Sequence, residues 1–283
     1  MSNLKILRQR IQSITATKKI TSAMKLIATS HFKKLQKQRK EAVLYTQNVH
    51  HILEKVLAHD PLNFEIPLLI KGRPGQKHLM LVLGSDKGLC GGFNPTVIKY
   101  AVEQAKITGD NVKFLCIGQK VLSTMPSNLR SDVLDTLSME SQSTYKDSGT
   151  LAHLLQDFLL SGAFDKISLV HNHFKSIICY VPTIQSLVPL ARAPQDNAPI
   201  LFGVEPNLNE LLESLAFKNL TATLYYACLE SHMSEHSARM MAMDSSTRNA
   251  EDMLHALKTT YHRSRQAMIT NELIEIIAGA EAL

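Results

Sequence analysis

Glycine and proline are confined almost entirely to the middle of this chain of 283 residues. All ten prolines and eleven of the twelve glycines lie between Pro61 and Pro206. Because these residue types are the strongest helix breakers, nothing in either terminal stretch forces a helix to end before Gly279. The sequence therefore predicts three parts, namely an N-terminal coiled-coil helix (1–60), an α/β domain with a proline-rich connector (61–206) and a C-terminal coiled-coil helix (207–283).

Both terminal stretches carry apolar residues at the seven-residue spacing of a coiled coil. The N-terminal seam consists of Leu4, Leu7, Ile11, Ile14, Ala28, Phe32, Leu35, Ala42, Val49, Leu53 and Val56. The C-terminal seam consists of Leu208, Leu211, Leu215, Ala222, Tyr225, Leu229, Met243, Ala250, Met253, Leu257, Ala267 and Ile274. Because the two helices flank a folded domain, we expect them to pair as an antiparallel coiled coil.

Polar residues interrupt both seams. In the first stretch they are Lys18, Thr21, Lys25, Arg39 and Thr46, and in the second they are Lys218, His232, His236, Arg239, Ser264 and Asn271. The sealed core of an ordinary bundle of shorter helices, which is the alternative interpretation, rarely holds so many charged groups. The interruptions favour a pair of long helices that an outside partner contacts.

The middle part alternates strands with helices. Apolar runs predict strands at 78–83, 112–117, 166–174 and 179–187, with helices at 96–107 and 150–160. This order indicates an α/β domain with a small, largely parallel, Rossmann-like sheet inserted between the long helices. Residues 125–148 are polar and predict no element, and residues 189–206 are expected to form an extended connector.

A glycine-rich loop, GSDKGLCGG, follows the first predicted strand. It matches neither of the glycine patterns of dinucleotide or nucleoside-triphosphate sites, so a phosphate-binding role is the weaker interpretation. The stronger one is a tight turn whose glycines allow close packing or a positive φ. Lys87, at its tip, is then an exposed contact residue.

One pattern is typical of a metal site. His232, Glu235 and His236 form an inverted zinc-protease pattern on a predicted helix, which makes a zinc hydrolase one alternative function. A catalytic zinc also needs a third ligand and a substrate cleft, and the sequence indicates neither. His171 and His173 lie on one side of a strand, where core or surface histidines are more usual than ligands. We therefore expect no metal and no cofactor.

The charge is distributed unevenly between the two ends. Residues 1–40 contain eleven Lys and Arg and no acidic residue, whereas residues 207–283 contain six basic and ten acidic residues. A solvated helix face and attraction between the two helices explain about half of this contrast. The functional interpretations of the contrast are an acidic protein partner and the phosphate backbone of a nucleic acid. A nucleic-acid-binding coiled coil is therefore the main alternative. The four cysteines are far apart, which indicates free thiols.

Three blocks of the sequence closely resemble the gamma subunits of F-type ATP synthases. They are the opening LRQRIQSITATKKITSAMKLIATS, the loop GSDKGLCGGFN, and the closing SEHSARMMAMDSSTRNAEDM with RSRQAMITNELIEIIAGAEAL. They occur in the family's order, and the resemblance covers the whole chain from Met1, so we expect no presequence. It is weakest between residues 120 and 160. His31 and Phe32 depart from the family, where Lys and a Leu or Met are common.

The resemblance implies a non-catalytic rotor that couples proton flow to ATP synthesis or hydrolysis. Its implied partners are the alpha and beta subunits of the catalytic hexamer, the epsilon subunit and the membrane c-ring, with no nucleic acid. The implied location is peripheral, at the cytoplasmic face of the bacterial inner membrane.

The family's contact positions, none of them catalytic, carry over by motif. Met24 lies in the segment that faces the beta subunits, and Lys87 lies in the beta-contacting glycine loop. Arg265 and Gln266 correspond to residues that hydrogen-bond a beta-subunit loop. Thr270 and Glu272, on the same helix, are tied to coupling.

Overall fold

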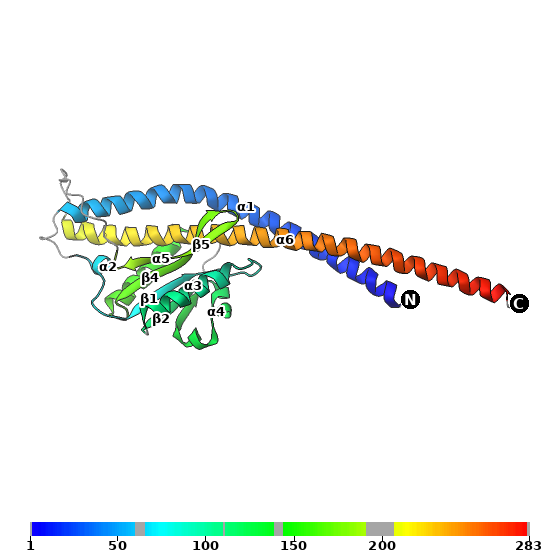
Figure 1. Cartoon of the computed structure of the whole chain (residues 1–283). Helices are drawn as coiled ribbons and strands as arrows, with labels where there is room; N and C mark the ends of the chain where they lie inside the picture. The colour runs from blue at the N-terminus through cyan, green and yellow to red at the C-terminus, as the bar shows by residue number, and fades with distance from the viewer. Residues whose placement is uncertain (1, 60–65, 110, 139–143, 191–206, 282–283) are drawn as a thin grey trace. The chain divides into compact units, whose positions relative to one another are not determined.

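The computed structural model describes residues 2–59, 66–109, 111–138, 144–190 and 207–281 (Figure 1). The chain divides into two compact units. We call residues 1–29 with 239–283 the helical unit, and residues 30–238 the globular unit. The units cut across the three parts expected from the sequence, because they are defined by contacts rather than by secondary structure. That three-part division therefore stays a prediction.

The two long terminal helices are continuous, as the sequence predicted. Helix α1 spans Ser2–His59 and helix α6 spans Leu208–Glu281. Neither has an interior proline, and Gly279 is the only glycine in either, so the backbone ladder is not interrupted. The alternative of several shorter helices in each stretch is wrong.

The globular unit contains one mixed sheet of five strands in the order β3-β2-β1-β4-β5. The strands are β1 His78–Leu83, β2 Val112–Ile117, β3 Val133–Leu137, β4 Lys166–Ser176 and β5 Cys179–Val188. The first four are parallel, and β5 pairs antiparallel with β4. The predicted small, largely parallel sheet is confirmed. The shorter helices are α2 Leu68–Lys71, α3 Phe93–Thr108, α4 Gln119–Thr124, η1 Ser127–Asp132 and α5 Tyr145–Leu160.

Strand β3 lies in the stretch for which the sequence predicted no element. It is the edge strand of the sheet, and none of its residues is fully buried. A half-exposed edge strand lacks the continuous apolar run that identified the other strands. Residues 191–206 of the expected connector lie outside the described residues.

The sheet separates two apolar cores. In β1, Leu79, Leu81 and Leu83 belong to one core, whereas Met80 and Val82 belong to the other. The second core is closed by α3 and α4, and the first by α5 together with parts of α1 and α6 (Figure 1). Because successive residues of a strand point to opposite faces, a central strand covered on both faces must be apolar throughout.

The long helices are part of the first core. Leu53 and Val56 of α1 are buried there with a row of α6 residues, Leu212, Leu215, Ala216, Leu220, Leu224, Ala227 and Cys228. Nearer the middle of α1, Phe32, Leu35 and Ala42 pack against Leu229 and Met233 of α6. Every apolar position of the predicted N-terminal seam within the globular unit is buried.

The polar residues that interrupt the N-terminal seam contact residues of α6. In the globular unit, Thr46 donates to the carbonyl oxygen of Ala222 at 3.3 Å. In the helical unit, Lys18, Thr21 and Lys25 contact Glu251, Thr247 and Asp244 at 2.5, 2.8 and 2.6 Å. Since the partners fall in number as the α1 residues rise, the helices are antiparallel in both units. These polar residues are satisfied within the chain.

One half of the predicted C-terminal seam is displaced by one residue in the helical unit. Met253 was expected on the seam but is 55% exposed, whereas Leu254 is 9% exposed. Ala267 and Ile274 are exposed as well, so those two predictions are also wrong. The inward positions are Met243, Thr247, Ala250, Leu254, Leu257, Tyr261, Ser264 and Met268. From Ala250 the observed seam advances by four residues and then by three, whereas the predicted seam advanced by three and then by four. Either order keeps the seam residues on one face of a helix.

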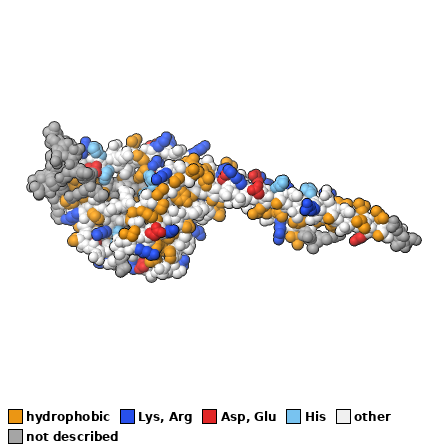
Figure 2. All heavy atoms as spheres, viewed as in Figure 1, with side chains coloured by type: hydrophobic (Ala, Val, Ile, Leu, Met, Phe, Trp, Pro, Cys, Tyr) orange, Lys and Arg blue, Asp and Glu red, His pale blue; other side chains and the backbone are white. Residues whose placement is uncertain are grey.

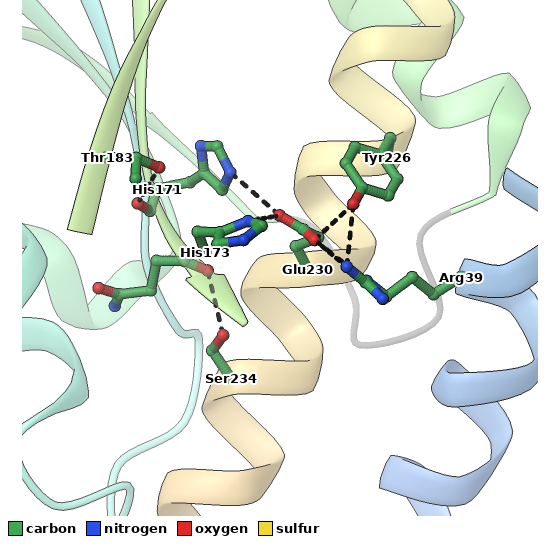
Figure 3. A network of polar contacts seen from close by, with 8 residues as sticks. Arg39, His171, His173, Thr183, Tyr226, Glu230 and Ser234 are labelled. Atoms are coloured by element: carbon green, nitrogen blue, oxygen red, sulfur yellow. Dashed lines mark hydrogen bonds and ion pairs between the residues drawn. The ribbon is translucent and has the colours of Figure 1, made fainter. Parts of the chain in front are cut away.

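A buried carboxylate joins both long helices to the sheet in the globular unit (Figure 3). Glu230 Oε1, on α6, accepts from Nε and Nη2 of Arg39, on α1, at 3.0 and 2.7 Å. The Tyr226 hydroxyl donates to the same oxygen at 2.6 Å. On β4, His173 Nδ1 lies 2.5 Å and His171 Nε2 lies 3.6 Å from Oε2. One side chain thus connects three elements.

These contacts keep Glu230 ionised. Burial by itself raises the pKa of the Glu230 carboxyl, but its contacts with His171, Tyr226, Arg39 and His173 outweigh burial and lower this pKa from 4.5 to about 2. Because the folded-state pKa lies below the ordinary value, the ionised carboxylate stabilises the fold above about pH 4.5. That contribution is lost as the pH falls toward 2.

The buried part of α1 should be far more sensitive to truncation than its exposed part. Leu53→Ala should lower the free energy of unfolding by about 2–5 kcal/mol, because it leaves a cavity in the first core. Leu53 is 0% exposed, whereas Leu44, on the same helix, is 63% exposed, so Leu44→Ala is the matched control. Urea unfolding followed by circular dichroism measures both. Equal losses would contradict the proposed packing of α1.

Replacing Glu230 by glutamine tests the buried carboxylate. Glu230→Gln should lower the free energy of unfolding by about 3 kcal/mol at pH 7, because Arg39 is left without its partner charge. The difference from the unchanged chain should shrink as the pH falls from 5 to about 2, where the native carboxylate itself becomes protonated. Urea titrations at several pH values measure this. A difference that is independent of pH would show that Glu230 acts by packing alone.

Candidate partner-contact surfaces

The glycine-rich loop between β1 and α3 is held by its own side chains. The backbone N–H of Ser85 donates to Asn94 Oδ1 at 3.0 Å, and Asn94 Nδ2 donates to Ser85 Oγ at 2.7 Å. Ser85 Oγ in turn donates to the carbonyl oxygen of Lys87 at 2.8 Å. Ser85 and Asn94 are both buried, so the base of the loop is rigidly placed.

Close packing explains the glycine that begins this loop. A Cβ atom added at Gly84 would lie 2.2 Å from Cγ2 of Val121 and 3.0 Å from Oδ1 of Asn94. Gly118, after β2, packs just as closely on this turn, because a Cβ atom added there would lie 2.8 Å from the carbonyl carbon of Gly84. Gly118 also has a φ of +108°, which L side chains rarely adopt. Gly91, within the loop, has a φ of +58°. These facts agree with the interpretation of the loop as a tight turn.

The loop is anchored to α6 but leaves its tip exposed. Cys90 and Phe93 form a small buried cluster with Ala238 of α6, and Tyr180 of β5 packs against it. Lys87 and Leu89, at the tip, are exposed. The structure therefore places Lys87 on a fixed, outward-facing turn.

The inverted zinc-protease pattern does not assemble a metal site. His232, Glu235 and His236 are all buried on α6. His232 Nδ1 lies 3.5 Å from Glu235 Oε2, and the His236 ring stacks on the ring of His31 with centroids 4.9 Å apart. In the part of the chain that the structure describes, the side chains whose ligand atoms converge are His171, His173 and Glu230. The zinc hydrolase built on the three α6 residues has no structural support.

The helical unit exposes apolar residues beside its seam. Met24 is half-buried on α1, and its neighbours Leu26 and Ile27 are exposed. Ile6, Ile20 and Ile27 are exposed and share one heptad position, so they form a second apolar stripe off the seam. This stripe was not among the predictions from the sequence, although its seven-residue spacing is present there.

Four of the predicted contact residues lie on one exposed segment of α6. Arg265, Gln266, Thr270 and Glu272 are all exposed. The Thr270 hydroxyl donates to the backbone carbonyl oxygen of Gln266, one turn earlier, at 3.0 Å. The antiparallel register places Arg265 opposite the start of α1, whereas Met24 faces the region of Asp244. The structure thus groups the four α6 residues and keeps Met24 apart from them.

The last turns of α6 extend past the start of α1 and are exposed throughout. Their exposed large apolar residues are Ile269, Leu273, Ile274, Ile276 and Ile277. Hydrophobic side chains are visible along this end of the molecule in Figure 2. A run of exposed apolar side chains is typical of a surface that another molecule covers. Within the described residues, no helix is both apolar enough and long enough to cross a membrane.

Comparisons with known proteins agree with the geometry. The sequence matches the protein family described as ATP synthase over residues 3–283. The ATP synthase gamma chain of Rhodospirillum rubrum is 38% identical over 299 residues, and that of Azorhizobium caulinodans is 35% identical over 289 residues. Both alignments cover 100% of this chain and 100% of the relative.

Solved structures share the fold at lower identity. A chain of the Euglena gracilis mitochondrial ATP synthase is similar with a TM-score of 0.69 and 15% identity, over 99% of this chain and 94% of that one. A chain of the Tetrahymena thermophila mitochondrial ATP synthase, from its central stalk and c-ring, has a TM-score of 0.63 and 24% identity, over 80% and 98%. The chain therefore belongs to the ATP synthase gamma-chain family, the non-catalytic central-stalk subunits of the rotary ATP synthase.

Proposed function

We propose that the helical unit turns inside a ring of alternating alpha and beta subunits and transmits torque between this ring and a membrane c-ring. The observation that supports this most directly is the exposed apolar surface of the helical unit, on Ile20, Leu26 and Ile27 and on the last turns of α6. An isolated chain gains nothing from such a surface, whereas a surrounding partner would bury it.

Coupling between rotation and nucleotide affinity requires only that the helix pair is asymmetric. An antiparallel helix pair has different residues on each side, so it presents a different face to each of the surrounding catalytic subunits. A contact shifts an open–closed equilibrium only by its difference in free energy between the two states. Since about 1.4 kcal/mol changes an equilibrium tenfold, a few altered contacts per face are enough to change nucleotide affinity strongly. Rotation then moves this bias from one catalytic subunit to the next.

The predicted contact residues take specific roles in this proposal. Arg265 and Gln266 hydrogen-bond a loop of a beta subunit, and Thr270 and Glu272 extend that contact along the same helix. Met24 meets the beta subunits from α1, and Lys87 meets them from the exposed tip of the glycine loop. All six act by contact, and the nucleotide sites belong to the surrounding subunits.

Besides the contact of Lys87 with the beta subunits, the globular unit has further partners in this proposal. The epsilon subunit and the membrane c-ring bind it, so that proton flow through the membrane sector drives rotation. The chain then works as a peripheral protein at the cytoplasmic face of a bacterial inner membrane. The sequence relatives of Rhodospirillum and Azorhizobium are bacterial, which supports this location.

Nucleic-acid binding by the basic N-terminal helix is less well supported. Lys18, Lys25 and Arg39 each form an ion pair with an acidic residue of α6. Part of the charge contrast between the helices is therefore used to pair them.

Purification of the tagged chain from its own cells should recover alpha and beta subunits with ATPase activity. Recovery of nucleic acid without these subunits would contradict the proposal that the chain is a rotor inside an alpha–beta ring.

The contact made by Arg265 and Gln266 can be tested in the reconstituted complex. The double variant Arg265→Ala, Gln266→Ala should reduce ATPase turnover about tenfold, because hydrogen bonds involving a charged group contribute about 1.5–3 kcal/mol. Native gels should show that the complex still assembles. The matched control is Gln36→Ala, Lys37→Ala, another adjacent and exposed pair, on α1 of the globular unit. Unchanged turnover in the first double variant would rule out the assigned contact.

A further inference from the structure

We propose that His171, His173 and Glu230 form a binding site for a divalent transition-metal ion, for which Zn²⁺ is the best chemical match. The site lies entirely within the globular unit, between β4 and α6. It is independent of the proposed contacts with alpha and beta subunits. It also departs from the sequence-based expectation that the chain binds no metal.

The three ligand atoms converge without rearrangement of the backbone. His171 and His173 alternate on β4, so both rings lie on the face of the sheet that meets α6 (Figure 3). Their ring nitrogens and Glu230 Oε2 all lie within 4.8 Å of one another. His171 and Glu230 are buried and His173 is half-buried, so the cluster has one side near solvent. An ion could enter from that side.

The donor set and its spacing suit zinc. Two imidazole nitrogens and one carboxylate oxygen are ligands that Zn²⁺ commonly binds, with a fourth position left for water. Bonds of about 2.0–2.2 Å in a tetrahedral site place the ligand atoms about 3.3 Å apart. The His171 to Glu230 distance of 3.6 Å is already close to that value. The His173 to Glu230 distance of 2.5 Å must open by less than 1 Å, which a small rotation of the half-buried ring provides.

The surroundings leave one carboxylate oxygen available for the ion. Arg39 and Tyr226 donate to Glu230 Oε1, so Oε2 is the atom that faces the two histidines. Such outer hydrogen bonds orient the ligands of many metal sites. The Thr183 hydroxyl donates to the backbone carbonyl oxygen of His171 at 3.3 Å, which supports β4 beside the site.

Arg39 opposes the ion. Its guanidinium lies 2.7 Å from Glu230 Oε1 and carries a positive charge next to the site. Two positive groups that share one carboxylate repel each other, and burial weakens the screening of that repulsion. The repulsion between Arg39 and the ion therefore lowers the affinity of the site for the ion. This affinity should rise when a neutral side chain replaces Arg39. This gives the proposal a signature that nonspecific binding to surface histidines lacks.

Binding can be measured on the untagged, full-length chain after treatment with a chelator. Titration with ZnCl₂ in a calorimeter should show one site per chain. Either His173→Asn or His171→Asn should weaken Zn²⁺ binding at least about tenfold, since even the loss of a supporting residue commonly costs that much. Arg39→Gln should strengthen binding about tenfold. The matched control is His255→Asn, which removes an exposed histidine of α6 and should leave the affinity unchanged.

Cobalt provides a second measurement that does not depend on affinity alone. Co²⁺ bound by two histidines and a carboxylate in a four-coordinate site should absorb strongly in the visible range. ZnCl₂ should abolish this absorption, and His173→Asn should prevent it. Circular dichroism shows whether each variant is folded. Zn²⁺ binding by the folded double variant His171→Asn, His173→Asn that equals binding by the unchanged chain would overturn the proposal, as would a Co²⁺ spectrum unaffected by His173→Asn.

Discussion

The pairing of α1 with α6 is the interaction on which the rest of the structure depends. Each helix carries an apolar stripe, and an isolated helix of this kind is marginal in water because its stripe stays exposed. Antiparallel pairing buries Phe32, Leu35 and Leu53 of α1 in the globular unit. The sheet then packs on this pair through the same core, so the α/β part and the helices stabilise each other.

Polar residues on the seam determine which residues of the helices face each other. Apolar contacts tolerate a shift along the helix, whereas the pairs Lys18–Glu251 and Lys25–Asp244 fit only one register. Glu230 extends this specificity to the sheet, because its two oxygens contact α1 and β4 respectively. A buried carboxylate that lost any of these partners would carry a large desolvation penalty. Specific alignment of both helices with the sheet is the physical role of this network.

The two units differ in how completely they bury their apolar residues. The globular unit encloses two apolar cores around its sheet, whereas the helical unit leaves whole stripes of isoleucine and leucine exposed. This difference is what a non-catalytic subunit of a larger enzyme requires. Its chemistry is carried out elsewhere, and its own contribution is a surface whose two sides are unlike. The family membership and the exposed surface therefore support the same function from independent observations.

The sequence by itself determined the two long helices, the N-terminal seam and four of the five strands, because each depends on local composition or periodicity. Tertiary structure decided the rest. Edge strand β3 is stabilised by pairing with β2 rather than by an apolar run. In the helical unit, packing of α6 against α1 buries Leu254 and leaves Met253 exposed. Arg39, His173 and Glu230 are distant in the sequence and meet only because β4 lies against the paired helices, and no local pattern encodes that meeting.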